Sequence, residues 1–207
     1  MKVQKFPSKT LVILDAGHGI DTPGKRSPIW SNNTQLFEWK FNRDIVDSII
    51  GYLQVANISY VKLIEESQDI SLKERVDRIN TICKENKDKY KVYLISIHGN
   101  AADNAPTANG IEVFTSIGET KSDTIAEVFY SKLKNLGWKM RPNRSNKGGK
   151  EENFYILKNS HCPAVLTENG FYTNEEECKK MLEFYWQKQI ALAHYKAIQD
   201  IEFKNLL

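Results

Sequence analysis

Three polar side chains follow apolar, strand-like segments of the 207-residue chain. His18 follows TLVILD, His98 follows KVYLISI, and Glu168 follows CPAVLT. In an open α/β sheet, ligands bind in the crevice outside the carboxyl ends of the strands. If these strands are parallel neighbours, we expect the three side chains to converge at one edge of the sheet.

A second carboxylate, Glu38, falls in the first turn of a helix expected to begin at residue 36. Its spacing to the apolar residues of that helix places it on the face that packs toward the sheet. A carboxylate buried there is costly to desolvate, and a metal ion would offset that cost. Two imidazoles and one carboxylate form a catalytic zinc set with a fourth position open for water. We therefore predict one zinc ion bound by His18, Glu38 and His98.

A hydrolytic zinc site also needs a base, and Glu168 is the candidate. Zinc lowers the pKa of its bound water and polarises a carbonyl group, and a base within hydrogen-bond range takes the proton from that water. Asp15 is an expected partner that fixes the imidazole tautomer of His18, although it could equally cap the loop. These residues predict zinc-dependent hydrolysis of an amide bond.

Each residue has a structural explanation when it is considered alone. A histidine after a strand is commonly structural or exposed. Taken alone, Glu38 is explained by the favourable interaction of a negative charge with a first helical turn. Glu168 alone is explained as a strand-end carboxylate whose hydrogen bonds are satisfied. Their shared placement is what favours a metal site. We expect His161 and His194 to be non-catalytic, and Cys162 to be a small buried apolar residue rather than a nucleophile.

The elements that position these residues alternate between strand-like and helix-like segments, which is typical of an α/β sheet with helices on both faces. The continuously apolar residues 10–14 fit a strand that is covered on both faces. Strands are predicted at residues 10–14, 58–63, 91–97, 110–115, 153–157 and 162–167, and helices at 36–54, 71–85, 121–136 and, as one or two helices, 175–203. Residues 100–109 and 141–152 are predicted to be loops that carry binding residues.

Composition is that of an ordinary soluble domain, with 41% hydrophobic and 27% charged residues and a net charge of +3. No block of like charges resembles a nucleic-acid-binding arm, and no apolar run is long enough for membrane insertion. The three cysteines lack CxxC spacing and are expected to be reduced thiols. The apolar run at residues 11–14 is too short for a signal peptide, so cytoplasmic synthesis is expected. A monomer is expected.

Six motifs occur in order from about residue 10 to residue 201. They are Asp15-Ala-Gly-His-Gly19, Glu38 with Asn42, Ser71-Leu72 with Arg75 and Asn80, Ser96-Ile-His-Gly-Asn100, Gly110-Ile-Glu-Val113, and Pro163-Ala-Val-Leu-Thr-Glu-Asn-Gly-Phe171 with Asn174. This order resembles that of the zinc-dependent N-acetylmuramoyl-L-alanine amidases of the third amidase type, which occur in bacterial cell-wall hydrolases and phage endolysins.

The resemblance implies that His18, Glu38 and His98 bind zinc and that Glu168 is the catalytic glutamate, which activates a metal-bound water. From its length and the lack of a linker we expect a single catalytic domain over residues 1–207, without a separate cell-wall-binding domain. The implied fold is a mixed, mostly parallel sheet of about six strands flanked by helices. The implied substrate is peptidoglycan, cut at the amide between N-acetylmuramic acid and L-alanine.

The sequence departs from better-known members of that family at two places. Residues 22–28 form an extension after the first histidine, and Gly99 stands where alanine is more usual. The sequence also shows no signal peptide and no wall-binding repeat. Together with the extension, this favours a phage or prophage lysin. Such an enzyme acts on the cell wall after release or export by another system.

Substrate-binding residues are expected at Asn100, Arg26 and Arg144, with Lys25 and Lys147 in the same rim loops. Solvated surface charge is an equally good explanation of the basic residues. Two other functions stay open: a zinc peptidase or deacetylase that acts on another cell-wall bond, and a non-catalytic wall-binding module.

Overall fold

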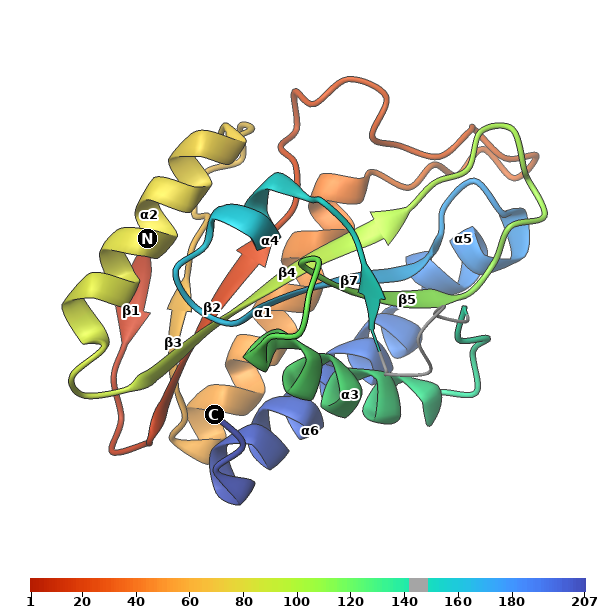
Figure 1. Cartoon of the computed structure of the whole chain (residues 1–207). Coiled ribbons are helices and arrows are strands. Elements are labelled where there is room, and N and C mark those ends of the chain that lie inside the picture. Colours follow the sequence, from red (N-terminus) through yellow and green to blue (C-terminus); the bar gives the residue numbers. More distant parts are fainter. Residues whose placement is uncertain (142–148) are drawn as a thin grey trace.

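The computed structural model describes residues 1–141 and 149–207 of the chain, in which strands and helices alternate (Figure 1). The strands are β1 (Lys2–Gln4), β2 (Thr10–Ala16), β3 (Ser59–Lys62), β4 (Lys91–Asn100), β5 (Ile111–Thr115), β6 (Lys150–Glu151) and β7 (Ala164–Phe171). The helices are α1 (Glu38–Ala56), α2 (Leu72–Asn86), α3 (Lys121–Lys134), α4 (Tyr155–Asn159), α5 (Glu175–Leu182) and α6 (Phe184–Lys204).

The described strands form one sheet in the order β1-β3-β2-β4-β7-β5-β6. β3, β2, β4 and β7 run parallel to one another, whereas β1 pairs antiparallel with β3 and β5 pairs antiparallel with β7. The prediction of an α/β fold with a mixed, mostly parallel sheet is confirmed. The described part of the chain has seven strands rather than about six, because the short β1 and β6 were not predicted and one predicted strand, at residues 153–157, is not formed.

The strand predicted at residues 153–157 is wrong, because this segment enters the helix α4. Its buried side chains are the consecutive residues Ile156 and Leu157. So short an apolar run has no periodicity that separates a strand from a buried helical turn. Near the same place, residues 150 and 151 of the predicted loop 141–152 pair with β5 instead.

Helices cover both faces of the sheet and give two apolar cores (Figure 1). α1, α3 and α6 pack on one face, where Val12 and Leu14 of β2 point. α2 and α4 pack on the other, where Leu11 and Ile13 point. Successive side chains of a strand point to opposite faces, which explains why every residue of β2 is buried.

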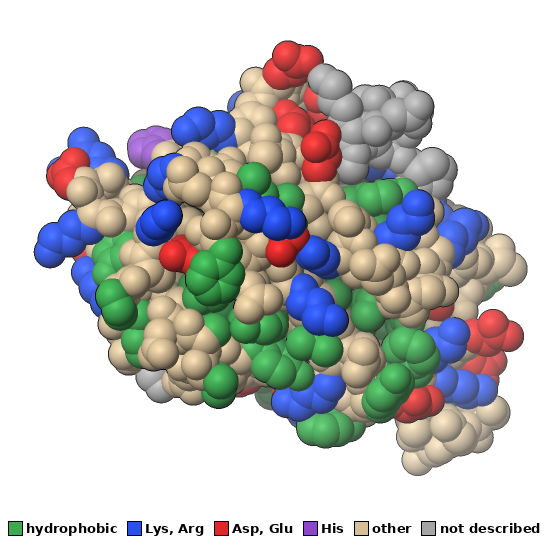
Figure 2. Space-filling view, turned by 90° about the horizontal axis from the view of Figure 1, so that it is seen from below, with side chains coloured by type: hydrophobic (Ala, Val, Ile, Leu, Met, Phe, Trp, Pro, Cys, Tyr) green, Lys and Arg blue, Asp and Glu red, His purple; other side chains and the backbone are tan. Residues whose placement is uncertain are grey.

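Charged side chains are spread over the surface rather than gathered by sign. Figure 2 shows Lys and Arg scattered among acidic and apolar side chains on the face seen from below, without a continuous basic patch on that face. Among the described residues, no helix is both long enough and apolar enough to cross a membrane.

Candidate metal centre

Parallel pairing places two of the chemistry-bearing strand ends side by side. His98 of β4 and Glu168 of β7 are direct partners in the register. On the other side of β4, Ala16 at the end of β2 pairs with Ile97, so that His18 follows close to His98. Glu38 is the first residue of α1. The predicted convergence at one edge of the sheet is confirmed.

The side chains of His18, Glu38 and His98 form a compact cluster. One possible ligand atom from each residue lies within 4.8 Å of the others. Glu38 Oε1 is 3.3 Å from His18 Nε2 and 3.1 Å from His98 Nδ1. The two imidazole rings meet edge to face, with centroids 5.0 Å apart.

The surroundings of Glu38 fit a bound cation. The side chain is only 1% exposed, and its Oε1 atom also accepts a hydrogen bond of 3.3 Å from the backbone N–H of Gly99. Its Oε2 atom is buried and has no hydrogen-bond partner among the described residues. A buried carboxylate oxygen without a hydrogen-bond partner is costly, and Lys25 Nζ, a charged group near it, is 4.0 Å away. Two imidazole nitrogens and one carboxylate make the donor set of a catalytic zinc site.

The same contacts determine which groups of the cluster carry charge. Burial alone would raise the pKa of Glu38, but hydrogen bonds and charge interactions with His18 and His98 hold that pKa well below its usual value. Burial opposes charge on His98, yet the hydrogen bond to Glu38 and the charges of Glu168 and Glu38 raise the pKa of this imidazole. The carboxylate of Glu38 is therefore negatively charged, and it faces the two imidazoles.

Glu168 is half-buried, with its Oε2 atom buried and without a hydrogen-bond partner among the described residues. Burial raises the pKa of this carboxyl group to about 8. The charge of Glu38 acts in the same direction, whereas His98 opposes it. A carboxyl group with a pKa near neutrality both accepts and returns a proton in the working range of an enzyme.

Gly17 lets β2 approach the ring of His98. A Cβ atom at this position would lie 2.0 Å from His98 Cε1, so only glycine fits without movement of the ring. The Gly17 carbonyl oxygen accepts a 3.1 Å hydrogen bond from Asn42 of α1. The next residue, His18, has a φ of 62°, in the left-handed region that non-glycine residues rarely adopt.

The start of α1 is held by the extension at residues 22–28. The residue before the helix, Phe37, makes no side-chain capping hydrogen bond. Instead the backbone N–H of Glu38 donates to the carbonyl oxygen of Lys25 at 3.0 Å. Ser27 and Leu36 add two hydrogen bonds, one between their backbones at 2.8 Å and one from Leu36 N to Ser27 Oγ at 2.9 Å. The extension thus fixes the turn that carries a candidate ligand.

A pocket of about 420 Å³ opens over the candidate metal centre. His18, His98 and Glu168 line it. Its lining also includes the apolar side chains of Leu72, Phe154 and Tyr155, which are exposed to solvent. Ligand sites are commonly concave and mostly apolar with a few polar groups.

Two further predictions concern Asp15 and Asn100, which lie near the cluster. Asp15 is buried, and its two carboxylate oxygens accept from Arg75 and Ser96 at 2.6 Å each. Its predicted hydrogen bond to the His18 imidazole is not among the contacts of the described residues and stays a prediction. Asn100 donates to Glu112 Oε2 at 2.6 Å, so its side chain is already engaged.

The predicted basic rim lies partly within the described residues. Lys25 lines the pocket, with its Nζ atom 4.0 Å from Glu38 Oε2. Arg26 is exposed in the extension and pairs through its backbone with Phe37. Arg144 and Lys147 lie outside the described residues.

The remaining histidines lie away from the cluster. His161 precedes β7 at the end opposite Glu168 and is exposed. His194 is fully buried in α6, between the hydroxyl of Thr167 at 3.0 Å and the carbonyl oxygen of Ile190 at 2.8 Å. Its contacts are those of a core residue.

Comparison with known proteins agrees with this geometry. Residues 12–200 match the family model described as N-acetylmuramoyl-L-alanine amidase. The chain belongs to this amidase family. Among its curated relatives, LytC of Bacillus subtilis strain 168 is 29% identical over 185 residues, which cover 88% of this chain and 33% of LytC. The endolysin of Bacillus phage SPP1 is 28% identical over 200 residues, covering 92% of this chain and 65% of the endolysin. The chain therefore spans a third of one relative and just under two thirds of the other.

Solved amidase structures share the fold. An N-acetylmuramoyl-L-alanine amidase of Clostridium difficile 630 superposes with a TM-score of 0.79 at 28% identity, over 94% of this chain and 97% of that one. The amidase AmiC2 of Nostoc punctiforme superposes with a TM-score of 0.74 at 26% identity, over 93% and 96% of the two chains. The family fold thus extends over nearly the whole chain.

Several residues around the centre were not predicted from spacing. Arg43 and Arg75 bond the backbone beside His18, and Phe154 and Tyr155 form the pocket wall. Arg75 stands in one of the six family motifs, and this was its only signal. The wall residues gave none, because the segment was predicted to be a strand.

Proposed function

We propose that this chain hydrolyses the amide bond between N-acetylmuramic acid and L-alanine in peptidoglycan, with one zinc ion held by His18, Glu38 and His98. The observation that carries the proposal is the cluster of His18, Glu38 and His98. Glu168 is the strand partner of His98, and it lines the same pocket as the two histidines. Membership of the amidase family supports the choice of bond.

A zinc ion in such a set, when bound, lowers the pKa of water and polarises the scissile carbonyl. Glu168 accepts the proton of the attacking water and returns it to the leaving amine of L-alanine. Its unpaired, buried Oε2 atom supports this role, because no other described group competes for the oxygen. Glu38 Oε1 contacts one ring nitrogen of each histidine, which brings the three proposed ligand groups together.

The pocket walls bind and orient the substrate. Leu72, Phe154 and Tyr155 offer apolar surface that excludes water from the scissile amide. Lys25 also lines the pocket and supplies positive charge there, and we propose that Lys25, Arg26 and Arg144 bind the carboxylates of the stem peptide. Asn100 lies two residues after His98 and donates a hydrogen bond to Glu112. We assign it to substrate binding from this position.

The test is digestion of purified peptidoglycan by zinc-loaded wild type and by Glu168→Gln, analysed by mass spectrometry. Wild type releases intact stem peptides with a free L-alanine amine. The variant loses activity by about 10²–10⁴-fold, the usual contribution of a general acid–base, while it retains zinc. Glu127→Gln, an exposed carboxylate of α3, is the matched control and leaves activity unchanged.

Other products decide between the alternatives. Cleavage within the stem peptide identifies a peptidase, and released acetate identifies a deacetylase. A zinc-loaded protein that binds peptidoglycan without forming any product is a wall-binding module. Undiminished turnover by Glu168→Gln refutes the assignment of the base.

The phage endolysin among the relatives supports the expectation that this is a phage or prophage lysin. Such a lysin added from outside to wall preparations of its host clears them without any further protein. A preparation that needs a second cell-derived factor contradicts this.

A further inference from the structure

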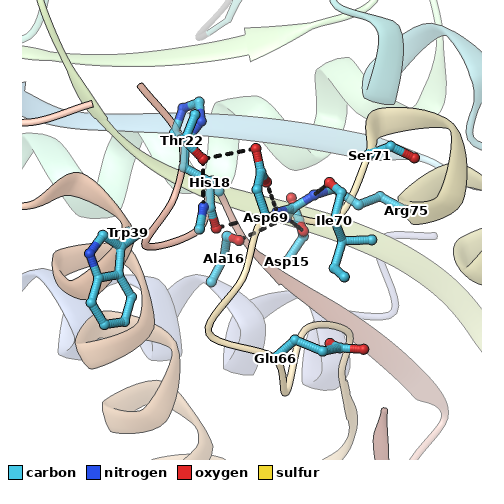
Figure 3. Close-up of polar contacts among 12 residues, drawn as sticks. Asp15, Ala16, His18, Thr22, Trp39, Glu66, Asp69, Ile70, Ser71 and Arg75 are labelled. Carbon is cyan, nitrogen blue, oxygen red and sulfur yellow. Dashed lines mark hydrogen bonds and ion pairs between the residues drawn. The ribbon is translucent and has the colours of Figure 1, made fainter. Parts of the chain in front are cut away.

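The backbone carbonyl oxygen of His18 accepts hydrogen bonds from two arginines on different helices. Arg43 of α1 donates through Nη1 at 2.9 Å, and Arg75 of α2 donates through Nη2 at 3.3 Å. Figure 3 shows Arg75 to the side of His18, with Asp69 between the two in this view. We call residues 16–19 the His18 turn.

The left-handed backbone of His18 makes these contacts informative. A φ of 62° is unfavourable for a residue with a side chain, and such strain persists only where surrounding contacts impose it. Strained residues of this kind gather at functional sites. The direction in which His18 presents its imidazole therefore depends on what holds its backbone.

Arg75 holds the residues before His18. The side chain is 2% exposed, and Nη1 donates to Asp15 Oδ1 at 2.6 Å and to the carbonyl oxygen of Ala16 at 2.8 Å. Asp15 Oδ2 accepts in turn from Ser96 at 2.6 Å. Because Ser96 lies on β4, two residues before His98, this chain of bonds sets the turn relative to the strand of the other candidate imidazole ligand.

Arg75 also holds the residues after His18, through Asp69. Its Nη2 atom is 3.0 Å from Asp69 Oδ1, while Asp69 Oδ2 accepts from Thr22 Oγ1 at 2.8 Å. Thr22 Oγ1 accepts from the backbone N–H of Gly19 at 2.8 Å. One guanidinium thus fixes the His18 turn from both sides, which the planar fork of arginine allows and a lysine ammonium does not.

We propose that Arg75 is a positioning residue for zinc: by fixing the His18 turn, it sets the affinity of the His18, Glu38 and His98 cluster for the ion. This rests on the proposed function only in taking the cluster as a zinc site. Residues that orient metal ligands typically change metal affinity by about 10–100-fold when they are replaced.

The test is zinc affinity, measured by competition with a chromogenic chelator in the absence of substrate. Arg75→Lys keeps a positive charge opposite Asp15 but loses the fork, and it is expected to raise the Kd for zinc by about 10–100-fold. Arg78→Lys is the matched control. This arginine lies on the same helix, bonds Glu66 and Glu74, and is expected to leave the Kd unchanged.

A general loss of stability is separated from misplacement by two further measurements. The expected Arg75→Lys protein unfolds without zinc at nearly the wild-type temperature, and excess zinc restores much of its turnover. If Arg75→Lys does not fold, Asp69→Ala decides, because Asp69 is 37% exposed and its loss removes the outer anchor of Arg75. A weaker zinc affinity in Asp69→Ala supports the proposal.

An unchanged Kd in a folded Arg75→Lys protein overturns the proposal, as does an unchanged Kd in Asp69→Ala where Arg75→Lys fails to fold. Neither result bears on the bond that is cut, since no substrate is present. Conversely, wild type that binds zinc but releases no L-alanine amine refutes the proposed function and leaves this inference standing. Wild type that does not bind zinc refutes both.

Discussion

The close approach of β2 to His98 makes Gly17→Ala a sharp perturbation of the candidate metal centre. The added Cβ atom would lie 2.0 Å from Cε1 and 2.4 Å from both ring nitrogens of His98. Non-bonded carbon atoms are normally separated by at least about 3.5 Å, so the ring must move by about 1.5 Å. Backbone strain is not involved, because the φ of Gly17 is not in the left-handed region.

The size of the effect follows from this displacement. A misplacement of about 1 Å at a catalytic group costs on the order of 10²-fold in rate. We therefore expect kcat/KM of Gly17→Ala to fall by about 100-fold or more, and the Kd for zinc to rise by about 10–100-fold. Overpacking a core costs typically about 1–3 kcal/mol, which a domain with about 5–15 kcal/mol of stability tolerates. The variant should fold.

Chelator competition and peptidoglycan digestion measure the two quantities. Gly51→Ala is the matched control, because a Cβ atom at Gly51 in α1 meets no atom within 4 Å. It should keep full activity and gain about 0.5–1 kcal/mol of stability from the better helix former. A Gly17→Ala protein with wild-type zinc affinity and activity would refute the reasoning, since the ring of His98 would then not need its observed place.

Three further outcomes are expected. Removing zinc lowers the thermal midpoint in calorimetry, because an ion at about 100 times its Kd stabilises the folded state by about 2.7 kcal/mol; an unchanged midpoint contradicts this. Burial lowers the pKa of His194 to about 4 from an ordinary value of 6.5. As the pH falls from 6.5 to about 4, the unfolded chain binds a proton at this residue that the folded chain does not bind. The free energy of unfolding therefore decreases by about 3 kcal/mol over this range. Urea unfolding of His194→Gln should show a shallower dependence on pH over this range, and an equally steep one rules the explanation out. Tyr155→Ala should raise KM more than it lowers kcat in digestion kinetics, because this exposed side chain lines the same pocket as Glu168 and has no acid–base role in the proposed reaction; a loss in kcat alone would count against a binding role.

The residues of the candidate centre could be predicted because their signals are local. Apolar runs marked β2, β4 and β7, and the polar residues after them belong to the same edge once the strands are parallel neighbours. Glu38 followed from helical spacing. The antiparallel direction of β5 could not be predicted, since hydrophobic periodicity is the same for a strand that runs either way.

What the sequence did not predict depends on contacts between distant segments. The bond from Arg75 to Asp15 joins residues 60 apart, and no spacing rule connects them. The clash that requires glycine at position 17 involves the ring of His98 on another strand. Spacing predicts which residues face a common edge, but the packing between elements determines which of them hold the others in place.

The place of β7 in the sheet has a consequence for the order of synthesis. β7 lies between β4 and β5, although it follows both in the chain. His18, Glu38 and His98 all precede residue 99, whereas Glu168 comes on the inserted strand. A chain emerging from the ribosome therefore carries its complete candidate ligand set before its base exists, and the facing edges of β4 and β5 stay open until β7 enters. A nascent chain that stops before β7 therefore has the three candidate ligands but lacks both the base and the strand that joins β4 to β5.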